Sequence, residues 1–130
     1  MDKESVATGI ALIVVCGLAL LISWVTKYRP PRQINWLYGY RTARSMRTPA
    51  AWHEANTYFA RYFWRLSLGL PVLAVAVYFL VDGVRALQVV LACWVLGLVV
   101  GAVRTERRLN QLFDDAGQLR GAETNAQSGP

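Results

Sequence analysis

The sequence predicts an all-α, polytopic membrane protein with three transmembrane helices, a structured loop after the first and an interfacial helix leading into the second. Two observations predict this class. Hydrophobic residues make up 55% of the 130 residues and charged residues only 17%. The hydrophobic residues also form long blocks, instead of alternating with polar ones at a helix or strand period. A soluble enzyme, a disordered chain and a disulfide-stapled secreted domain all match this pattern poorly.

Three blocks are long enough to span a membrane: residues 6–26, 64–81 and 86–103. The first block carries no formal charge, and as a helix it covers roughly 30 Å, the thickness of a hydrocarbon core. Only residues 82–85 separate the second and third blocks, so these two helices must form an antiparallel hairpin. We expect one membrane domain over residues 1–120 with a loop at 27–63, and a disordered tail at 121–130 because those residues are small and polar.

A cleaved signal peptide is the alternative for the first block. The residues before it, Met1 to Glu4, carry no net positive charge from their side chains, and no small-x-small cleavage site follows the block. We therefore expect an uncleaved helix.

The distribution of Lys and Arg predicts the orientation, because loops rich in these residues stay in the cytoplasm. The side opposite the long loop carries only Lys3 and Arg85. The long loop and the C-terminal segment share one side and carry Lys27, Arg29, Arg32, Arg41, Arg44, Arg47, Arg104, Arg107, Arg108 and Arg120. We expect the N-terminus outside, the C-terminus in the cytoplasm and anionic lipid headgroups as partners of this basic side.

Local signals refine the helices. Thr48 followed by Pro49 predicts a helix start, with the hydroxyl as the cap. Aromatic residues at three- and four-residue spacing then indicate an interfacial helix that bends or runs straight into the second span. Pro71 is either a packing device or the lining of a cavity. The pattern of residues 105–119 predicts a short amphipathic extension that lies on the inner membrane surface.

Small residues at spacing four, Cys93, Gly97 and Gly101, form a strip on the third span that favours close helix packing. The partner helix is either in the same chain or in a second copy, so a homo-oligomer stays open. The other cysteine, Cys16, lies in a different apolar block, and we expect both thiols to pack in lipid without forming a disulfide.

The sequence offers little catalytic chemistry, and we expect neither an enzyme nor a cofactor. A single histidine, His53, and two lipid-embedded cysteines do not make a metal site. His53 and Glu54 point about 100° apart on a helix, so they form no acid–base pair by themselves. The net charge of +6 is explained by the inside-positive segments, so we expect no nucleic-acid partner.

The most unusual segment is residues 35–46, Asn-Trp-Leu-Tyr-Gly-Tyr-Arg-Thr-Ala-Arg-Ser-Met. Gly39 permits a left-handed turn, Asn35 can cap one, and Arg41 offers a planar fork of five donors for carbonyls or a phosphate. Thr42 and Ser45 can bond back to the backbone. The segment is either a folded lid laid on the interface by Trp36, Tyr38 and Tyr40, or a basic loop with aromatic anchors.

This pattern of residues resembles the SdpI family of small bacterial integral membrane proteins, in the short form that has the three-helix domain alone. The resemblance covers about residues 6–103, and its most specific part is residues 39–45 with Trp52. The family commonly has proline after its Arg-Thr pair, where this chain has Ala43. The matching positions, which the resemblance implies are the functional binding residues and not catalysts, are Asn35, Gly39, Tyr40, Arg41, Thr42, Ser45, Trp52 and Asn56.

The resemblance implies a protein of the bacterial cytoplasmic (inner) membrane that gives immunity to, or senses, a secreted membrane-active peptide toxin. The alternative is a structural or accessory subunit that docks on a larger membrane complex through Gly97 and Gly101. A third hypothesis is a membrane enzyme with Arg41 and His53 at headgroup level.

Overall fold

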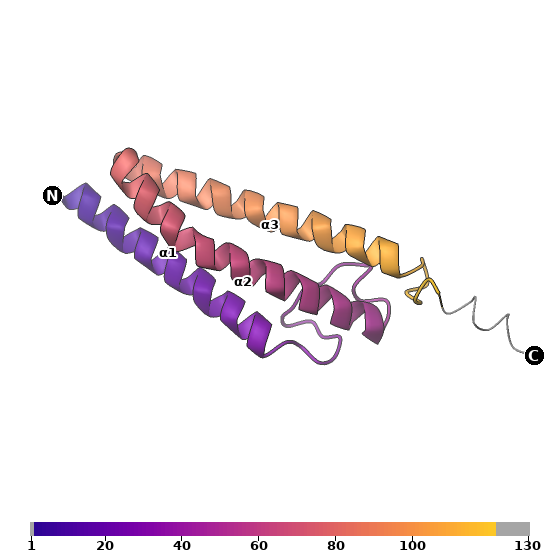
Figure 1. Ribbon diagram of the computed structural model, residues 1–130. Coiled ribbons are helices and arrows are strands. Elements are labelled where there is room, and N and C mark those ends of the chain that lie inside the picture. Colours follow the sequence, from indigo (N-terminus) through magenta and orange to yellow (C-terminus); the bar gives the residue numbers. More distant parts are fainter. Residues whose placement is uncertain (1, 122–130) are drawn as a thin grey trace, which may run out of the picture.

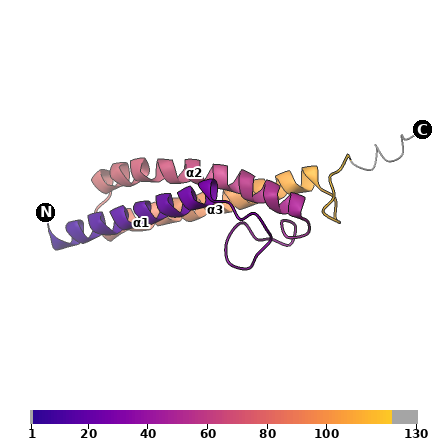
Figure 2. The same ribbon diagram turned by 90° about the horizontal axis from the view of Figure 1, so that it is seen from below.

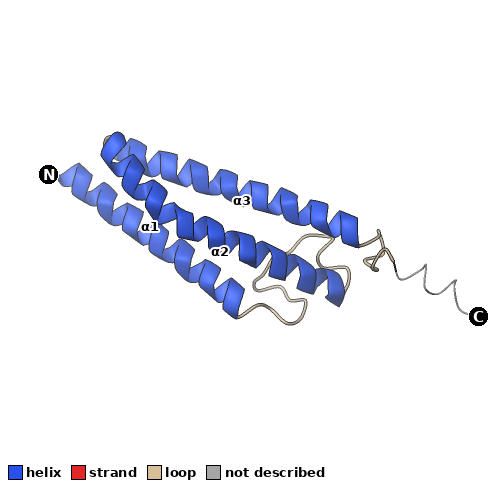
Figure 3. Cartoon of the chain, in the orientation of Figure 1, coloured by secondary structure: helices blue, strands red, loops and turns tan. Residues whose placement is uncertain are grey.

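The computed structural model describes residues 2–121 and contains three helices, α1 (Lys3–Tyr28), α2 (Pro49–Leu80) and α3 (Val84–Leu112) (Figure 1). Within these residues the only extended pairing is an isolated bridge between Phe113 and Leu119, so helices and loops account for the fold (Figure 3). The start of α1 lies beside the α2–α3 turn, and the long loop lies at the other end of the bundle (Figure 1). The expected all-α class is confirmed.

All three helices are long and apolar enough to cross a membrane. α1 and α3 contain the expected spans at 6–26 and 86–103, and α2 ends one residue before the expected end of the second span, at Leu80. The helices are longer than the apolar blocks, however. The 32 residues of α2 extend over about 48 Å, against roughly 30 Å for a hydrocarbon core. Because α2 begins at Pro49 and α3 continues to Leu112, both helices project beyond the apolar layer at the loop end of the bundle.

The start of α2 follows the predicted signal. Thr48 is the N-cap, its hydroxyl oxygen accepts from the Ala51 amide at 3.2 Å, and Pro49 occupies the first turn. The helix then continues without interruption through Pro71 to Leu80. The stretch expected as an interfacial helix and the second span are therefore one helix, and the loop is confined to residues 29–48 instead of 27–63.

Small side chains allow α1 to approach α2 closely. Ala19 is fully buried and Cys16 is buried on α1, and they belong to a core shared with Leu70 and Ala74 of α2 and Val90 of α3. In lipid, helices associate through such close packing instead of through exclusion of water.

The glycine strip of α3 faces α2 of the same chain. A Cβ at Gly97 would meet the Leu66 side chain, and one at Gly101 would meet the rings of Tyr62 and Phe59. The Tyr62 hydroxyl donates to the Gly97 carbonyl at 2.8 Å, which fixes the ring across the strip. Cys93, expected in the same strip, is exposed and is not part of this contact.

The segment after α3 is a compact turn. α3 ends at Leu112, so only the first part of the expected extension at 105–119 is helical. Asp114 Oδ1 then accepts from the amides of Ala116 at 3.0 Å and Gln118 at 2.8 Å. The Thr48 hydroxyl donates to the Gly117 carbonyl at 2.7 Å, so this turn packs on the start of α2. The predicted tail lies outside the described residues, apart from Gly121.

The glycine contact between α2 and α3 gives a stability prediction. In G101A the new methyl group would overlap the Tyr62 ring, whereas nothing lies within 4 Å of the same atom in G69A. Both variants replace a helical glycine by alanine and gain similar helix propensity. The difference between their unfolding free energies therefore reports the overpacking at Gly101 alone. We expect the unfolding free energy of G101A in detergent to fall about 1–3 kcal/mol below that of G69A. Equal stabilities would show that α2 and α3 do not pack as described.

Candidate functional site

The loop at residues 29–48, together with the ends of α2 and α3 that hold it, forms what we call the loop cap. Its centre is Asn56 on α2, which is 5% exposed. Asn56 Oδ1 accepts from the Tyr40 amide at 2.6 Å, and Asn56 Nδ2 donates to the Trp52 carbonyl at 2.9 Å. The side-chain amide therefore gives a buried loop N–H the acceptor that no regular secondary structure supplies.

The backbone reaches Asn56 only because residue 39 is glycine. Gly39 has a φ of 114°, and an added Cβ would lie 2.6 Å from Asn56 Oδ1 and 2.8 Å from the Pro31 ring. Trp52 packs against the same part of the loop. It is fully buried, and its indole N–H donates to the Pro31 carbonyl at 3.0 Å. The positive φ and the close approach together exclude a side chain.

The Tyr40 side chain connects the loop to α3. Its hydroxyl donates toward Glu106 Oε1 at 2.8 Å and the Ala102 carbonyl at 3.1 Å, and its ring packs against Phe59 at a centroid distance of 5.0 Å. Burial raises the pKa of Tyr40 above its ordinary value, and the Glu106 carboxylate raises it further. Tyr40 was expected at the lipid interface, but the structure buries it, with 9% of its surface exposed. The physical reason is that the Asn56 contact turns the ring inward, toward α3.

A short turn holds the next part of the loop. The Thr42 amide donates to Ser45 Oγ at 2.8 Å, and the Ser45 amide donates to Thr42 Oγ1 at 3.2 Å. Ser45 is fully buried, and its hydroxyl donates to the Tyr40 carbonyl at 3.0 Å. The two hydroxyls therefore cap each other's backbone, in the way a capping box satisfies a helix start.

The remaining two predicted residues, Asn35 and Arg41, hold the outer part of the loop. Asn35 Oδ1 accepts from the amides of Leu37 and Tyr38, both at 3.0 Å. Arg41 is exposed, and one of its guanidinium nitrogens bonds the Trp36 carbonyl. The structure thus brings all eight predicted residues into the loop cap: Asn56 and five others form its centre, and Asn35 and Arg41 lie at its rim.

Several partners in the cap were not identified from the sequence. Glu106 also lies 3.7 Å from Arg44, whose guanidinium donates to Asn110 at 2.8 Å. A second link between the helix ends joins Arg108 of α3 to Glu54 of α2 at 2.5 Å. Apart from Arg44, which lies in the loop, these residues share one sequence signal: they are polar or charged positions on helix segments that continue past an apolar block.

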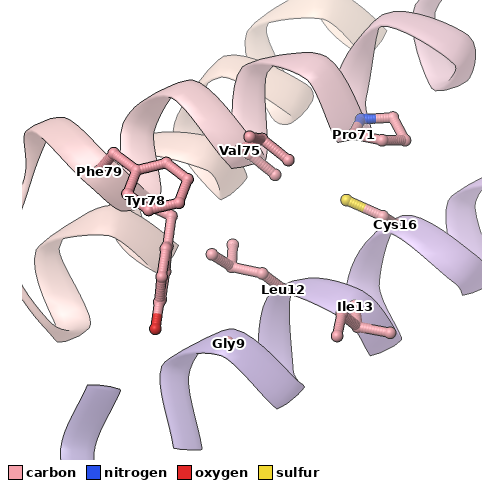
Figure 4. Close-up of a pocket in the computed structure, with 9 residues that line it drawn as sticks. Gly9, Leu12, Ile13, Cys16, Pro71, Val75, Tyr78 and Phe79 are labelled. Atoms are coloured by element: carbon pink, nitrogen blue, oxygen red, sulfur yellow. The ribbon is translucent and has the colours of Figure 1, made fainter. Parts of the chain in front are cut away.

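A second feature lies within the membrane-spanning part of the bundle. An apolar groove of about 400 Å³ opens between α1 and α2 (Figure 4). The groove was not predicted as a site. The lining of a cavity was, however, one of the two roles left open for Pro71. Residues of both helices line the groove: Gly9, Leu12, Ile13, Cys16, Pro71, Ala74, Val75, Tyr78 and Phe79.

The groove exists because small side chains leave space between larger ones. Gly9, Cys16 and Ala74 sit among its walls, while Ile13 and Phe79 are 74% and 80% exposed at its rim. Nearly all of the lining is hydrocarbon, so its chemistry favours an apolar chain over a polar or charged ligand.

These features define a class: a multi-pass membrane protein of three helices, with a hydrogen-bonded cap over one end of the bundle. The model of the SdpI/YfhL protein family matches residues 32–104, which include most of the loop, all of α2 and most of α3. The chain belongs to this family.

A relative supports the same assignment. The chain is 33% identical over 101 residues to YfhL of Bacillus subtilis (strain 168), a protein described as uncharacterized, and the alignment covers 78% of this chain and 87% of YfhL. No solved structure matches the chain significantly.

The Tyr40 contact predicts a pH-dependent stability of the cap. In Y40F the bonds to Glu106 and Ala102 are lost, and we expect the cap to be about 1–2 kcal/mol less stable at neutral pH. Trypsin should therefore cleave after Arg44 faster in Y40F than in the wild type. Y38F is the matched control, because its exposed hydroxyl bonds only the rim of the loop, at the Arg29 carbonyl.

The sign of the pH effect follows from the raised pKa of Tyr40. The protonated phenol is favoured in the folded cap, so the contribution of Tyr40 is complete below about pH 10, the ordinary tyrosine pKa. It is lost as the pH rises through the raised pKa. The difference in thermal stability between the wild type and Y40F should therefore be complete at neutral pH and shrink as the pH rises above about 10. A difference that grew with pH would contradict the assignment.

Proposed function

We propose that this chain is a non-enzymatic protein of the bacterial inner membrane that gives immunity to, or senses, a membrane-active peptide. In this proposal the apolar groove binds an apolar segment of the peptide, and the loop cap on the cytoplasmic side responds. The observation that carries the proposal is the groove of about 400 Å³ between α1 and α2.

The position of the groove supports a ligand that arrives through lipid. Its walls belong to the apolar parts of α1 and α2, and its rim side chains are exposed to the surroundings of the bundle. A ligand entering from the bilayer would replace lipid hydrocarbon on these walls, so selectivity would come from shape and close packing.

The loop cap supports a mechanical link between the groove and the cytoplasm. The helices that form the groove, α1 and α2, are the ones that the loop joins. The indole of Trp52 on α2 holds Pro31, which follows α1 by only a few residues. A change in the distance between α1 and α2 would therefore act on the contact between Pro31, Gly39 and Trp52.

The distribution of charge supports the orientation in this proposal. The basic residues of the loop lie at the same end of the bundle as Arg104, Arg107 and Arg108 of α3, and Lys3 and Arg85 lie at the opposite end (Figure 1). The positive-inside rule then puts the cap in the cytoplasm and the α2–α3 turn outside.

A protection assay tests the groove with a matched pair of variants. Val75 lines the groove and is 60% exposed, whereas Val72, also on α2, is 72% exposed and is not part of the lining. A sensitive bacterium that expresses each variant is challenged with membrane-active peptides while its membrane potential is followed. We expect V75W to lose protection because the indole fills the groove, and V72W to protect like the wild type.

The same assay tests the cap through Arg41. The variant R41A should insert normally and lose most of its protection, because the rim of the loop loses its bond to the Trp36 carbonyl. Full protection by both V75W and R41A at normal membrane levels would contradict the proposed function.

A further inference from the structure

The outermost part of the loop presents large apolar side chains to its surroundings. Trp36 is 83% exposed and Leu37 is 88% exposed, and Ile34 and Tyr38 beside them are 37% and 43% exposed. We call these four residues the loop tip. They lie outside the three spanning segments, where contiguous exposed apolar residues mark a contact surface.

The loop tip is held in a defined conformation. The amides of Leu37 and Tyr38 both donate to Asn35 Oδ1, and the Tyr38 hydroxyl donates to the Arg29 carbonyl at 3.1 Å. The Trp36 carbonyl is bonded by Arg41. The exposed side chains therefore project from an ordered turn, and binding through them would cost little conformational entropy.

The loop tip also lies near the level at which α1 leaves the apolar layer. The last two turns of α1 carry Trp24, Lys27 and Tyr28, and the Lys27 ammonium lies 5.1 Å from the Tyr28 ring and 5.3 Å from the Trp64 ring of α2. Trp, Tyr and Lys together are typical of the headgroup boundary. Figure 2 shows the loop after α1 as a wide bend that projects sideways from the bundle.

All formal charges within the loop at residues 29–48 are positive. Arg29, Arg32 and Arg41 are exposed, and residues 5–53 contain neither Asp nor Glu. A protein partner with an apolar surface would explain the exposed Trp36 and Leu37 but not the uninterrupted positive charge. An anionic phospholipid surface explains both, because it offers phosphates beside a hydrocarbon boundary.

We propose that the loop tip is a membrane anchor, in which Trp36 and Leu37 insert into the boundary between headgroups and acyl chains. Arg29 and Arg32 bind the phosphates of anionic phospholipids in the same leaflet. Tyr40 takes no part in this anchor, since it is buried against α3. The anchor is independent of the proposed peptide binding and would act in the absence of any peptide.

Fluorescence of Trp36 in nanodiscs tests the anchor. The full-length chain is reconstituted in phosphatidylcholine alone and in phosphatidylcholine with phosphatidylglycerol, with and without acyl chains brominated near the headgroup. The spectrum of W36F, subtracted from that of the wild type, isolates the emission of Trp36. In the anionic nanodiscs we expect a blue-shifted emission that brominated lipid quenches and aqueous iodide does not.

Charge variants separate the role of the headgroups. The double variant R29Q/R32Q should reduce quenching of Trp36 by brominated lipid in anionic nanodiscs, and R85Q, at the opposite end of the bundle, should not. Emission of Trp36 at the wavelength of a water-exposed indole, quenched by iodide in both lipid mixtures, would overturn the proposal. Equal insertion in both mixtures, unaffected by R29Q/R32Q, would overturn the assignment of anionic lipid as the partner.

Discussion

A single buried side-chain amide, that of Asn56, organises the loop cap. Its oxygen accepts from the Tyr40 N–H at 2.6 Å, where the loop has no strand or helix to supply an acceptor. A buried amide without an acceptor costs about 1–3 kcal/mol. The glycine at position 39, the inward direction of the Tyr40 ring and the burial of Ser45 all follow from bringing the backbone to this atom.

The same contact explains why α2 and α3 are longer than a bilayer requires. Asn56 lies in the first part of α2, and Glu106, which accepts from the Tyr40 hydroxyl, lies in the last part of α3. Because these polar groups lie beyond the hydrocarbon layer, they avoid the large free-energy cost of placing charge in lipid. The bundle therefore has an apolar end with the groove and a polar end with the loop cap, and α2 contributes to both.

Much of this architecture could be predicted from the sequence. The lengths of the apolar blocks predict the three spans, and Thr48 with Pro49 predicts the start of α2, because both signals are local. The eight candidate residues of the loop cap were identified through a family resemblance, and local chemistry explains four of them: Asn35, Gly39, Thr42 and Ser45.

The remaining features depend on contacts between residues far apart in the sequence. Glu106 follows Tyr40 by 66 residues, and no periodicity indicates that pairing. The groove depends on how two helices cross, and a single sequence does not specify that crossing. Of the two alternatives for the stretch before the second span, the structure has the one in which the helix runs straight into the span. Backbone hydrogen bonds continue across the boundary between water and lipid, so α2 does not end where its composition changes.

Hydrogen exchange of the loop amides tests most directly whether Asn56 organises the loop cap. In N56L the Tyr40 amide loses its acceptor, and we expect the amides of Tyr40 and Ser45 to exchange at least about tenfold faster while those within α1 keep their protection. H53L is the matched control, since His53 is an exposed residue one turn earlier on α2. Unchanged protection of Tyr40 in N56L would contradict the account, because the loop would then be held by contacts other than Asn56.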